Sequence, residues 1–307
     1  MRFGAALLLL TLGACRNVDE PPQVDHPDAA PVVPHLRVAT FNVRRFFDTV
    51  CDSGVCNNGA YEDQPTQEEF DARATQIAAA IRTMDADVIA VEEVESQACL
   101  DALIAKLSDV MPYGVLGESG FAASVDVGIL SRTPIDSSIG HQEELVLPDG
   151  RVTTFARELL EVHTHTTDGT NLIMFAAHFK SKSSDDPARR LAEGQASARI
   201  VNDVATQNTD ALVVMGGDLN DTPGSPALNA LTVDGALTRV ADDLPVDAQG
   251  TYRYHASVEV IDHLLLAPTT QTARRIPLSS HSWRPTGGGG WGGSDHYALS
   301  SDFALRQ

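Results

Sequence analysis

Residues 212–221 read Leu-Val-Val-Met-Gly-Gly-Asp-Leu-Asn-Asp, and this stretch decides the fold. Its apolar first half predicts a buried strand over residues 211–215. Two glycines follow the strand, and Asp218 and Asn220 come directly after them. An Asp or Asn after a strand is most often a turn former. The stretch gains weight because the same arrangement recurs elsewhere in the chain.

Apolar strands that end in polar side chains occur at five other places. Asn42 closes the apolar run 38–41, and Glu93 closes the run 88–92. The other places are His178 after residues 173–177, Asp262 within residues 260–264, and Asp295-His296 before residues 297–299. Each of these residues alone has a structural explanation, as a turn or as a hydrogen-bonded side chain. Their joint occurrence in this order is the informative feature.

In this order the motifs resemble those of the endonuclease/exonuclease/phosphatase superfamily of metal-dependent phosphodiesterases, and the resemblance extends from Leu36 to Leu305. Phe41-Asn42-Val43 is similar to the first motif, and Glu92-Glu93-Val94 is similar to a glutamine-glutamate-valine motif with its first position changed. The two most specific motifs resemble residues 217–221 and Ser294-Asp295-His296, and residues 127–131 resemble an intervening strand.

The resemblance implies that a divalent cation takes part in phosphodiester hydrolysis. Such a cation neutralises the charge that develops on the phosphate, and Mg²⁺ takes oxygen ligands from one or two carboxylates. Glu93 is the first metal candidate, with Asn42 and Asp295 beside it by analogy with the family. Mg²⁺ is the expected cofactor, and Mn²⁺ or Ca²⁺ are alternatives.

The resemblance also implies roles for the remaining motif residues. Asp218 is expected to orient or deprotonate the attacking water, and Asn220 to hold that water or a phosphate oxygen. His178 and His296 are expected to contact nonbridging oxygens or to exchange a proton. Asp262 is the expected partner of His296.

Cations near these motifs are candidates for substrate contacts. Arg157 is interpreted as a guanidinium clamp on the phosphate, with a surface strand cation as the competing interpretation. Lys180 and Lys182 directly follow His178 and are placed to contact substrate phosphates. His263, next to Asp262 in sequence, faces either the site or the core.

The spacing of apolar residues predicts many strands and few helices. Helices are predicted over residues 68–84 and 187–205, with a short one after Pro223. Strands are predicted at 36–43, 85–91, 126–131, 153–163, 171–178, 211–215, 260–266 and 297–303. This pattern favours sheet-on-sheet packing flanked by helices over one doubly wound sheet. With the resemblance, it predicts a four-layer α/β sandwich of two mixed β-sheets packed face to face with helices outside.

Composition excludes one class of protein. The chain of 307 residues carries 22 Lys and Arg against 42 Asp and Glu, a formal net charge of -20. Such a charge repels polyanions at long range, so a basic protein that coats nucleic acid is excluded. An enzyme that handles phosphates through a bound divalent cation stays possible, because the ion inverts the local field.

The N-terminal residues indicate export. Residues 1–15 combine one positive charge, a short apolar run and Leu-Gly-Ala-Cys, which resembles a bacterial lipobox ending at Cys15. We therefore expect a lipoprotein signal peptide at 1–15, a flexible tether at 16–35 and the enzyme domain at 36–307. The expected location is the outer membrane or cell surface through lipidated Cys15, with an ordinary signal peptide and an extracellular protein as the alternative.

Three cysteines follow Cys15 in the sequence. Cys51 and Cys56 lie in a Gly/Asn-rich loop and are candidates for a disulfide, which leaves Cys99 single. Zinc is the competing interpretation, and it is weakened because no second ligand pair stands at structural spacing.

Three function classes follow from these observations. The leading hypothesis is a secreted or surface-anchored nuclease that acts on extracellular nucleic acid. The alternative is a sphingomyelinase-like lipid phosphodiesterase or a phosphatase, for which Trp283 and Trp291 around the glycines 287–290 are either an exposed membrane-contacting loop or two packed indoles. The third is a non-catalytic binding protein on the same fold. The sequence predicts no oligomeric state.

Overall fold

The computed structural model of the protein describes Met1 and residues 35–306 except 58, 256 and 286–289. Cys15 and nearly all of the predicted signal peptide and tether lie outside the described residues, so the signal peptide, the lipidation and the tether stay predictions. None of the described helices combines the length and the apolarity that crossing a bilayer requires.

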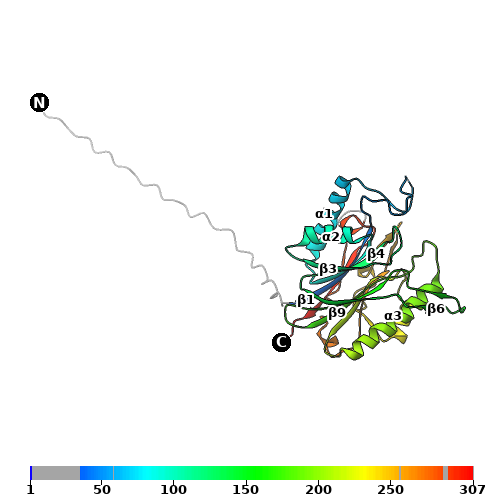
Figure 1. Ribbon diagram of the computed structural model, residues 1–307. Helices are drawn as coiled ribbons and strands as arrows, with labels where there is room; N and C mark the ends of the chain where they lie inside the picture. Colours follow the sequence, from blue (N-terminus) through cyan, green and yellow to red (C-terminus); the bar gives the residue numbers. More distant parts are fainter. Residues whose placement is uncertain (2–34, 58, 256, 286–289, 307) are drawn as a thin grey trace. The chain divides into compact units, whose positions relative to one another are not determined.

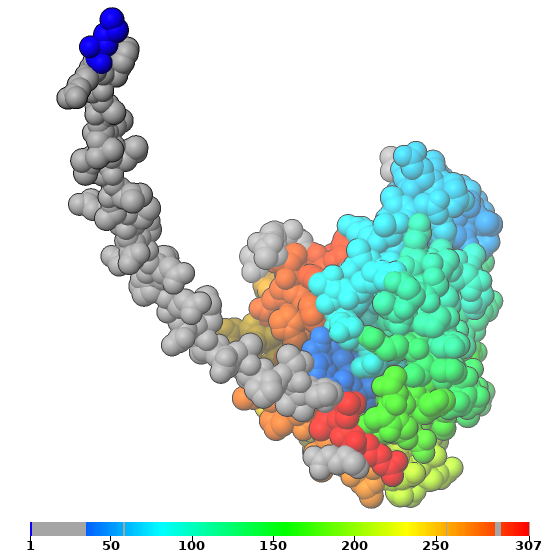
Figure 2. All heavy atoms as spheres, turned by 90° about the vertical axis from the view of Figure 1, so that its left-hand side faces the viewer, coloured from blue at the N-terminus to red at the C-terminus, as the bar shows by residue number. Residues whose placement is uncertain are grey.

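The described residues of the domain form two six-stranded mixed sheets and two short ribbons. The first sheet has the order β15-β16-β1-β2-β4-β3, in which only β1 and β2 are parallel neighbours. Its strands are β1 (His35–Phe46), β2 (Val88–Val94), β3 (Tyr113–Gly117), β4 (Asp126–Ser131), β15 (His281–Trp283) and β16 (Ala298–Ala304). Figure 2 shows the blue start of the domain beside the red C-terminal residues, in agreement with the pairing of β1 and β16.

The second sheet has the order β11-β14-β10-β9-β8-β5, in which only β9 and β10 are parallel neighbours. Its strands are β5 (Ile135–His141), β8 (Leu159–His165), β9 (Asn171–His178), β10 (Leu212–Asp218), β11 (Thr238–Arg239) and β14 (Asp262–Leu266). Two short ribbons add β6 (Leu145–Val146) with β7 (Val152–Thr153), and β12 (Tyr252–Tyr254) with β13 (Ser257–Glu259).

Helices lie on the outer faces of both sheets (Figure 1). Helices α1 (Gln67–Met84) and α2 (Gln97–Leu107) pack on the first sheet, and α3 (Pro187–Gln207) and α4 (Pro226–Asn229) pack on the second. Single turns complete the described elements: η1 (Ala230–Asp234), η2 (Val246–Ala248), η3 (Thr272–Arg274) and η4 (Trp291–Gly293). The predicted four-layer α/β sandwich is confirmed.

Alternation along the strands explains the layers. In β1, Ala39 and Phe41 face the helices, while Val38 faces the other sheet. In β10, Val213 faces α3 and Val214 faces the first sheet. Because both faces of the central strands are buried, their sequences read as continuous apolar runs.

Sequence also sets where helices begin. Thr66 and Glu69 form a capping box at the start of α1, and Asp186 caps α3 ahead of Pro187. Asp85 takes a left-handed conformation that ends α1. The next strand therefore spans Val88–Val94, three residues later than the predicted 85–91.

One predicted strand is divided in the structure. Residues 153–163 were expected to be continuous, but β7 ends at Thr153 and β8 begins at Leu159. Between them, the backbone N–H of Ala156 donates to the buried carboxylate of Glu193 on α3, at 2.7 Å. The contact lies in the segment between β7 and β8, which also contains Arg157.

We predict that Gly217→Ala destabilises the domain by about 3 kcal/mol or more. Gly217 has φ +153, and an added Cβ would lie 1.8 Å from the carbonyl oxygen of Ala177 on β9, so the parallel pair would be forced apart. Thermal and urea unfolding measure the change. Gly224→Ala is the matched control, since it has a positive φ but open space around it. Equal losses in both variants would contradict the assigned role of close packing at Gly217.

Candidate active site

A cavity of about 860 Å³ lies where the predicted residues meet. It is lined by nine of the eleven predicted site residues: Glu93, Arg157, His178, Lys180, Lys182, Asp218, Asn220, Asp295 and His296. The other two, Asn42 and Asp262, are buried and hydrogen-bonded to lining residues. The two sheets therefore bring the sequence motifs into one site.

Strand register in the second sheet creates a row of three functional side chains. Asp218 on β10 is in register with His178 on β9 and with Asp262 on β14. All three residues are almost fully buried. The backbone N–H groups of Ile261 and Asp262 donate to the Thr251 hydroxyl at 3.1 and 3.0 Å, which fixes the start of β14.

His296 joins this row from the loop before β16. Its Nδ1 lies 3.0 and 2.9 Å from the two carboxylate oxygens of Asp262, and its Nε2 lies 3.8 Å from Asp218 Oδ2. Burial opposes a positive charge on the ring, but Asp262 and Asp218 outweigh it and raise the pKa of His296 to about 10. Burial and the charge of Asp262 raise the pKa of Asp218 to about 7. The site thus holds an imidazolium between two carboxylates.

His178 differs from His296 in charge. Its Nε2 lies 3.7 Å from Asp218 Oδ2, and its Nδ1 is buried without a hydrogen-bond partner among the described residues. Burial, together with the charges of Arg157 and His296, holds the pKa of His178 well below its usual range. His178 is therefore a neutral imidazole, and Asp218 has a neutral and a charged ring on its two sides.

The first sheet supplies Glu93 and Asn42. Glu93 has φ +66, and this left-handed conformation coincides with an irregularity in the pairing of β2 and β4. Its Oε2 accepts the backbone N–H of Arg45 at 2.8 Å. The amide nitrogen of Asn42 donates to Glu93 Oε1 at 3.2 Å and to Asp218 Oδ2 at 3.0 Å, so Asn42 joins the two sheets.

The predicted roles need the side-chain oxygen of Asn42 for the metal and the side-chain nitrogen of Asn220 for the water or the phosphate. Both atoms are hydrogen-bonded within the protein instead. Asn42 presents nitrogen to the carboxylates, while its Oδ1 accepts the backbone N–H of Arg44 at 2.9 Å. Asn220 donates its amide nitrogen to the carbonyl oxygen of Phe179 at 3.1 Å, and its backbone N–H donates to Asp218 Oδ1 at 2.9 Å. In this arrangement both asparagines orient carboxylates.

Asp295 stands at the rim of the site. Its carboxylate lies 3.6 Å from Arg44 Nε, and about a third of its side chain is exposed. The preceding Ser294 donates its hydroxyl to the carbonyl oxygen of Asn42 at 2.7 Å and accepts the backbone N–H of His296 at 3.0 Å. Ser294 thus ties the last motif to the first.

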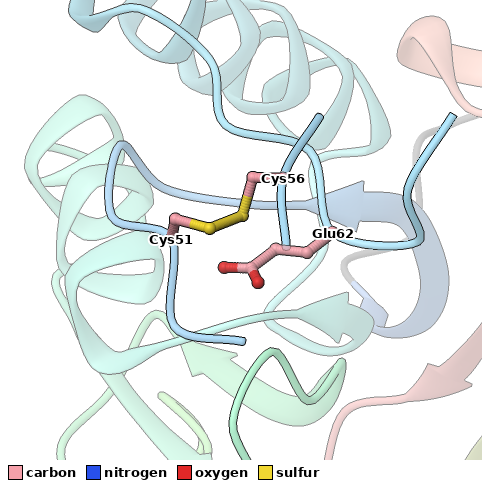
Figure 3. Close-up of side chains that lie close together, drawn as sticks. All are labelled: Cys51, Cys56 and Glu62. Atoms are coloured by element: carbon pink, nitrogen blue, oxygen red, sulfur yellow. A yellow bond between two sulfur atoms is a disulfide. The ribbon is translucent and has the colours of Figure 1, made fainter. Parts of the chain in front are cut away.

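The donor chemistry of the cluster fits a hard divalent cation. Ligand atoms of Glu93, His178 and Asp218 lie within 4.8 Å of one another, and Asp295 adds a carboxylate to the same cavity. Carboxylate oxygens are the ligands that Mg²⁺ prefers. Cys51 and Cys56, by contrast, form a disulfide beside Glu62, so the zinc interpretation of this pair is wrong (Figure 3).

Cations and aromatic rings surround the carboxylates. Lys182 Nζ lies 3.8 Å from Asp221, and the backbone N–H of Lys180 donates to Glu193 Oε2 at 2.8 Å.

The sequence analysis did not predict five residues at or beside the site: Arg45, Tyr61, Tyr252, Tyr254 and the buried Glu193. The pair Arg44-Arg45 after the first motif was a visible signal, whereas the tyrosines lie on loops and a short ribbon without any pattern. The ring centroids of Tyr252 and His296 are 4.7 Å apart.

The two tryptophans pack against each other and not into open solvent. Their ring centroids are 5.7 Å apart, both border the core under α1, and Trp283 donates its indole N–H to the Ser300 hydroxyl at 2.9 Å. This geometry matches the interpretation as two packed indoles. The glycines between them at 287–289 lie outside the described residues.

Comparison with known proteins points to one family. The profile of the Endonuclease/Exonuclease/phosphatase family matches residues 39–296, a span that contains every predicted site residue. No curated protein matches the chain in sequence.

Solved structures share the fold at low sequence identity. An endonuclease/exonuclease/phosphatase protein from Beutenbergia cavernae is 18% identical with a TM-score of 0.61, over 88% of this chain and 72% of that chain. TDP2 from D. rerio, complexed with single strand DNA product, is 17% identical with a TM-score of 0.61, over 88% and 98%. Sphingomyelinase C from Streptomyces griseocarneus is 21% identical with a TM-score of 0.58, over 88% and 99%. These similarities establish the fold, and activity must be argued from the site.

We predict that His263 makes the domain sensitive to acid. His263 is buried behind the site, where Arg239 Nε donates to its Nδ1 at 3.2 Å and its Nε2 donates to the Asp221 carbonyl oxygen at 2.9 Å. Burial and the charge of Arg239 lower its pKa to about 3. The unfolded chain therefore binds a proton that the folded chain excludes, and stability present above pH 6.5 is lost as the pH falls toward 3.

His263→Gln should remove up to about 1.4 kcal/mol per pH unit from the slope of unfolding free energy below pH 6.5. Urea unfolding between neutral pH and pH 4 measures this slope. His165→Gln, at an exposed ion pair with Asp136, is the control that replaces a surface histidine and keeps the buried imidazole. A wild-type slope in His263→Gln would show that this imidazole is not held neutral.

Proposed function

The chain belongs to the endonuclease/exonuclease/phosphatase family of metal-dependent phosphodiester hydrolases, and from this premise we propose that it is a Mg²⁺-dependent nuclease acting on extracellular nucleic acid. The observation that carries the proposal is Asp218, which lies between the neutral His178 and the charged His296 at a cavity that also holds Glu93. Such a site offers a base, a donor and oxygen ligands to one phosphate.

Each side chain has a proposed role in hydrolysis. Glu93 and Asp295 would hold the cation, and Asn42 keeps Glu93 and Asp218 in place. A bound Mg²⁺ supplies positive charge that neutralises the oxyanion developing on phosphorus. Asp218 accepts a hydrogen bond from the attacking water and orients it, with the backbone N–H of Asn220 fixing the other carboxylate oxygen.

His296 is proposed to stabilise the charge that develops on a nonbridging oxygen. Asp262 holds the Nδ1 side of the ring, so Nε2 is the nitrogen that faces Asp218 and the cavity. A charged donor preorganised in a buried site stabilises the transition state more than the ground state. His178, kept neutral by burial, is proposed to donate one hydrogen bond to the phosphate without adding charge.

The surroundings of the cavity favour a polyanion over a lipid. Arg44, Arg45, Arg157, Lys180 and Lys182 all line it, in a chain whose overall charge is strongly negative. The exposed ring of Tyr254 at the same cavity offers a stacking surface for bases. TDP2, which shares the fold, was solved with a single-stranded DNA product.

The alternative is a sphingomyelinase-like lipid phosphodiesterase or a phosphatase. The fold similarity to sphingomyelinase C favours it, while the two packed indoles remove one membrane-contacting feature that it would use. A non-catalytic binding role is disfavoured because Glu93, Asp218 and His296 all meet at the cavity.

We also propose that the protein is exported and anchored through a lipid on Cys15. The pattern of residues 1–15 supports this, and so does the disulfide between Cys51 and Cys56, because disulfides persist in oxidising compartments. The anchored domain would then meet nucleic acid outside the cell.

We predict that Asp218→Ala and His296→Ala each lower kcat by about a thousandfold while the fold is retained. Hydrolysis of plasmid DNA, RNA and sphingomyelin vesicles by the domain from residue 36 onward, with Mg²⁺ and with EDTA, measures activity, and thermal unfolding checks the fold. His165→Ala is the matched control. Wild-type activity in both variants would overturn the site assignment, and cleavage of the lipid alone would replace the nuclease by the alternative.

Lys180 and Lys182, which line the cavity, give a separate prediction. Lys180→Glu with Lys182→Glu should raise KM for DNA by about tenfold at low salt, because two cations that face the backbone phosphates become repulsive. The difference should shrink as salt is added. Lys106→Glu on α2 is a control that reverses a charge remote from the cavity lining. An unchanged KM at low salt in the double variant would show that residues 180–182 do not guide the DNA backbone.

A further inference from the structure

We propose that the loop closed by the Cys51–Cys56 disulfide positions the substrate: it fixes Tyr61 in the wall of the catalytic cavity, and Tyr61 in turn holds Arg45 against the phosphate. This inference rests on the proposed hydrolysis at the same site. Tyr61 is therefore a positioning residue, and the disulfide is the clamp that keeps it in place.

The disulfide acts on the cavity through Glu62. Figure 3 shows the Glu62 carboxylate directed toward the disulfide-closed loop. The backbone N–H groups of Asp52 and Ser53, within that loop, donate to its two oxygens at 2.6 and 2.8 Å. Only 2% of Glu62 is exposed, and although burial acts to raise the pKa of Glu62, the hydrogen bonds from Ser53 and Asp52 outweigh burial and lower it. The carboxylate therefore stays charged and anchored to the loop.

Tyr61 is held from the loop side and from one flank. It is the chain neighbour of Glu62, and its ring meets the buried Phe47 edge to face at 5.9 Å. On another side Tyr61 borders a second hollow of about 320 Å³, between the disulfide loop and Ala122-Ala123. Because that hollow leaves one side of Tyr61 without packing, the position of Tyr61 depends on the anchored loop and on Phe47.

Tyr61 contacts the cations that surround the cavity. The guanidinium of Arg45 lies over its ring, 4.7 Å from the centroid. Arg157 lines the same cavity as Tyr61, and burial raises the pKa of Tyr61 against the opposing charge of Arg157. Arg157 is held from below by the carbonyl oxygen of Val125, which accepts Arg157 Nε–H at 3.2 Å. Both arginines line the cavity with Glu93 and His178.

This arrangement separates binding from chemistry. The Arg45 backbone binds Glu93 whatever its side chain does, so displacing Tyr61 leaves the oxygen donors and Asp218 in place. Loss of Tyr61 should therefore weaken phosphate binding and leave the chemical step nearly unchanged.

The experiment compares Tyr61→Ala, Tyr61→Phe and the pair Cys51→Ser with Cys56→Ser, using bis(p-nitrophenyl) phosphate with Mg²⁺. Tyr61→Ala and the double serine variant should raise KM by about tenfold with kcat within about twofold of wild type. Tyr61→Phe keeps the ring under Arg45 and should recover part of the loss. Tyr113→Ala, a partly exposed tyrosine on β3, is the matched control and should leave KM unchanged.

A second readout keeps this inference apart from the proposed function. Calorimetry with inorganic phosphate should show affinity about tenfold weaker in Tyr61→Ala than in wild type, whether or not the ester is hydrolysed. If wild type binds phosphate but hydrolyses no ester, the proposed function fails and this test still stands. Wild-type KM and phosphate affinity in Tyr61→Ala would overturn the inference, as would a fall in kcat without a change in KM.

Treatment of the native protein with a reductant guards against misfolding of the serine variant. Reduction should raise KM of wild type to the value of the double serine variant and leave that variant itself unchanged. An unchanged KM after complete reduction, verified by thiol counting, would remove the disulfide from the proposal.

Discussion

The parallel pairing of β9 with β10 is the constraint on which the site depends. It places His178 opposite Asp218, and the antiparallel pairing of β10 with β14 places Asp262 on the other side of Asp218 in the same register. The close approach needs Gly217, because a side chain there would meet the backbone of Ala177. A shift of one residue in the strand register would turn these side chains to the opposite face of the sheet, and the three would no longer lie side by side.

Burial of this row explains its electrostatics. Two carboxylates without a counter-charge would be costly in a dry interior, and the imidazolium of His296 between Asp218 and Asp262 offsets that cost. His178 faces the same Asp218 but lies near Arg157, so a second imidazolium would add repulsion. Two histidines at similar distances from one carboxylate thus carry different charges, which suits them to different tasks at one phosphate.

The motifs predicted the fold and the residues that meet, because apolar strands with polar ends leave a local signal in the sequence. What they could not predict depends on contacts distant in sequence. Residues 153–163 read as one strand, since nothing local reveals that the backbone N–H of Ala156 donates to Glu193 on α3 between β7 and β8. Asn42 turns its amide nitrogen toward the site because Asp218 and Glu93 both accept a hydrogen bond from it. Tyr61 lies on a loop whose position depends on Glu62 and a disulfide.

The charge distribution links these points. A net charge of -20 keeps polyanions away at long range, so an anionic substrate must be attracted locally. The cavity does this with cations held by neutral or anionic partners: Lys182 near Asp221, Arg44 near Asp295, and Arg45 over Tyr61. Partners of this kind orient a cation but leave it able to meet a phosphate. The attraction is then short-ranged and depends on positions of side chains, so a loop that moved Tyr61 by a few ångströms would change binding before it changed the chemistry.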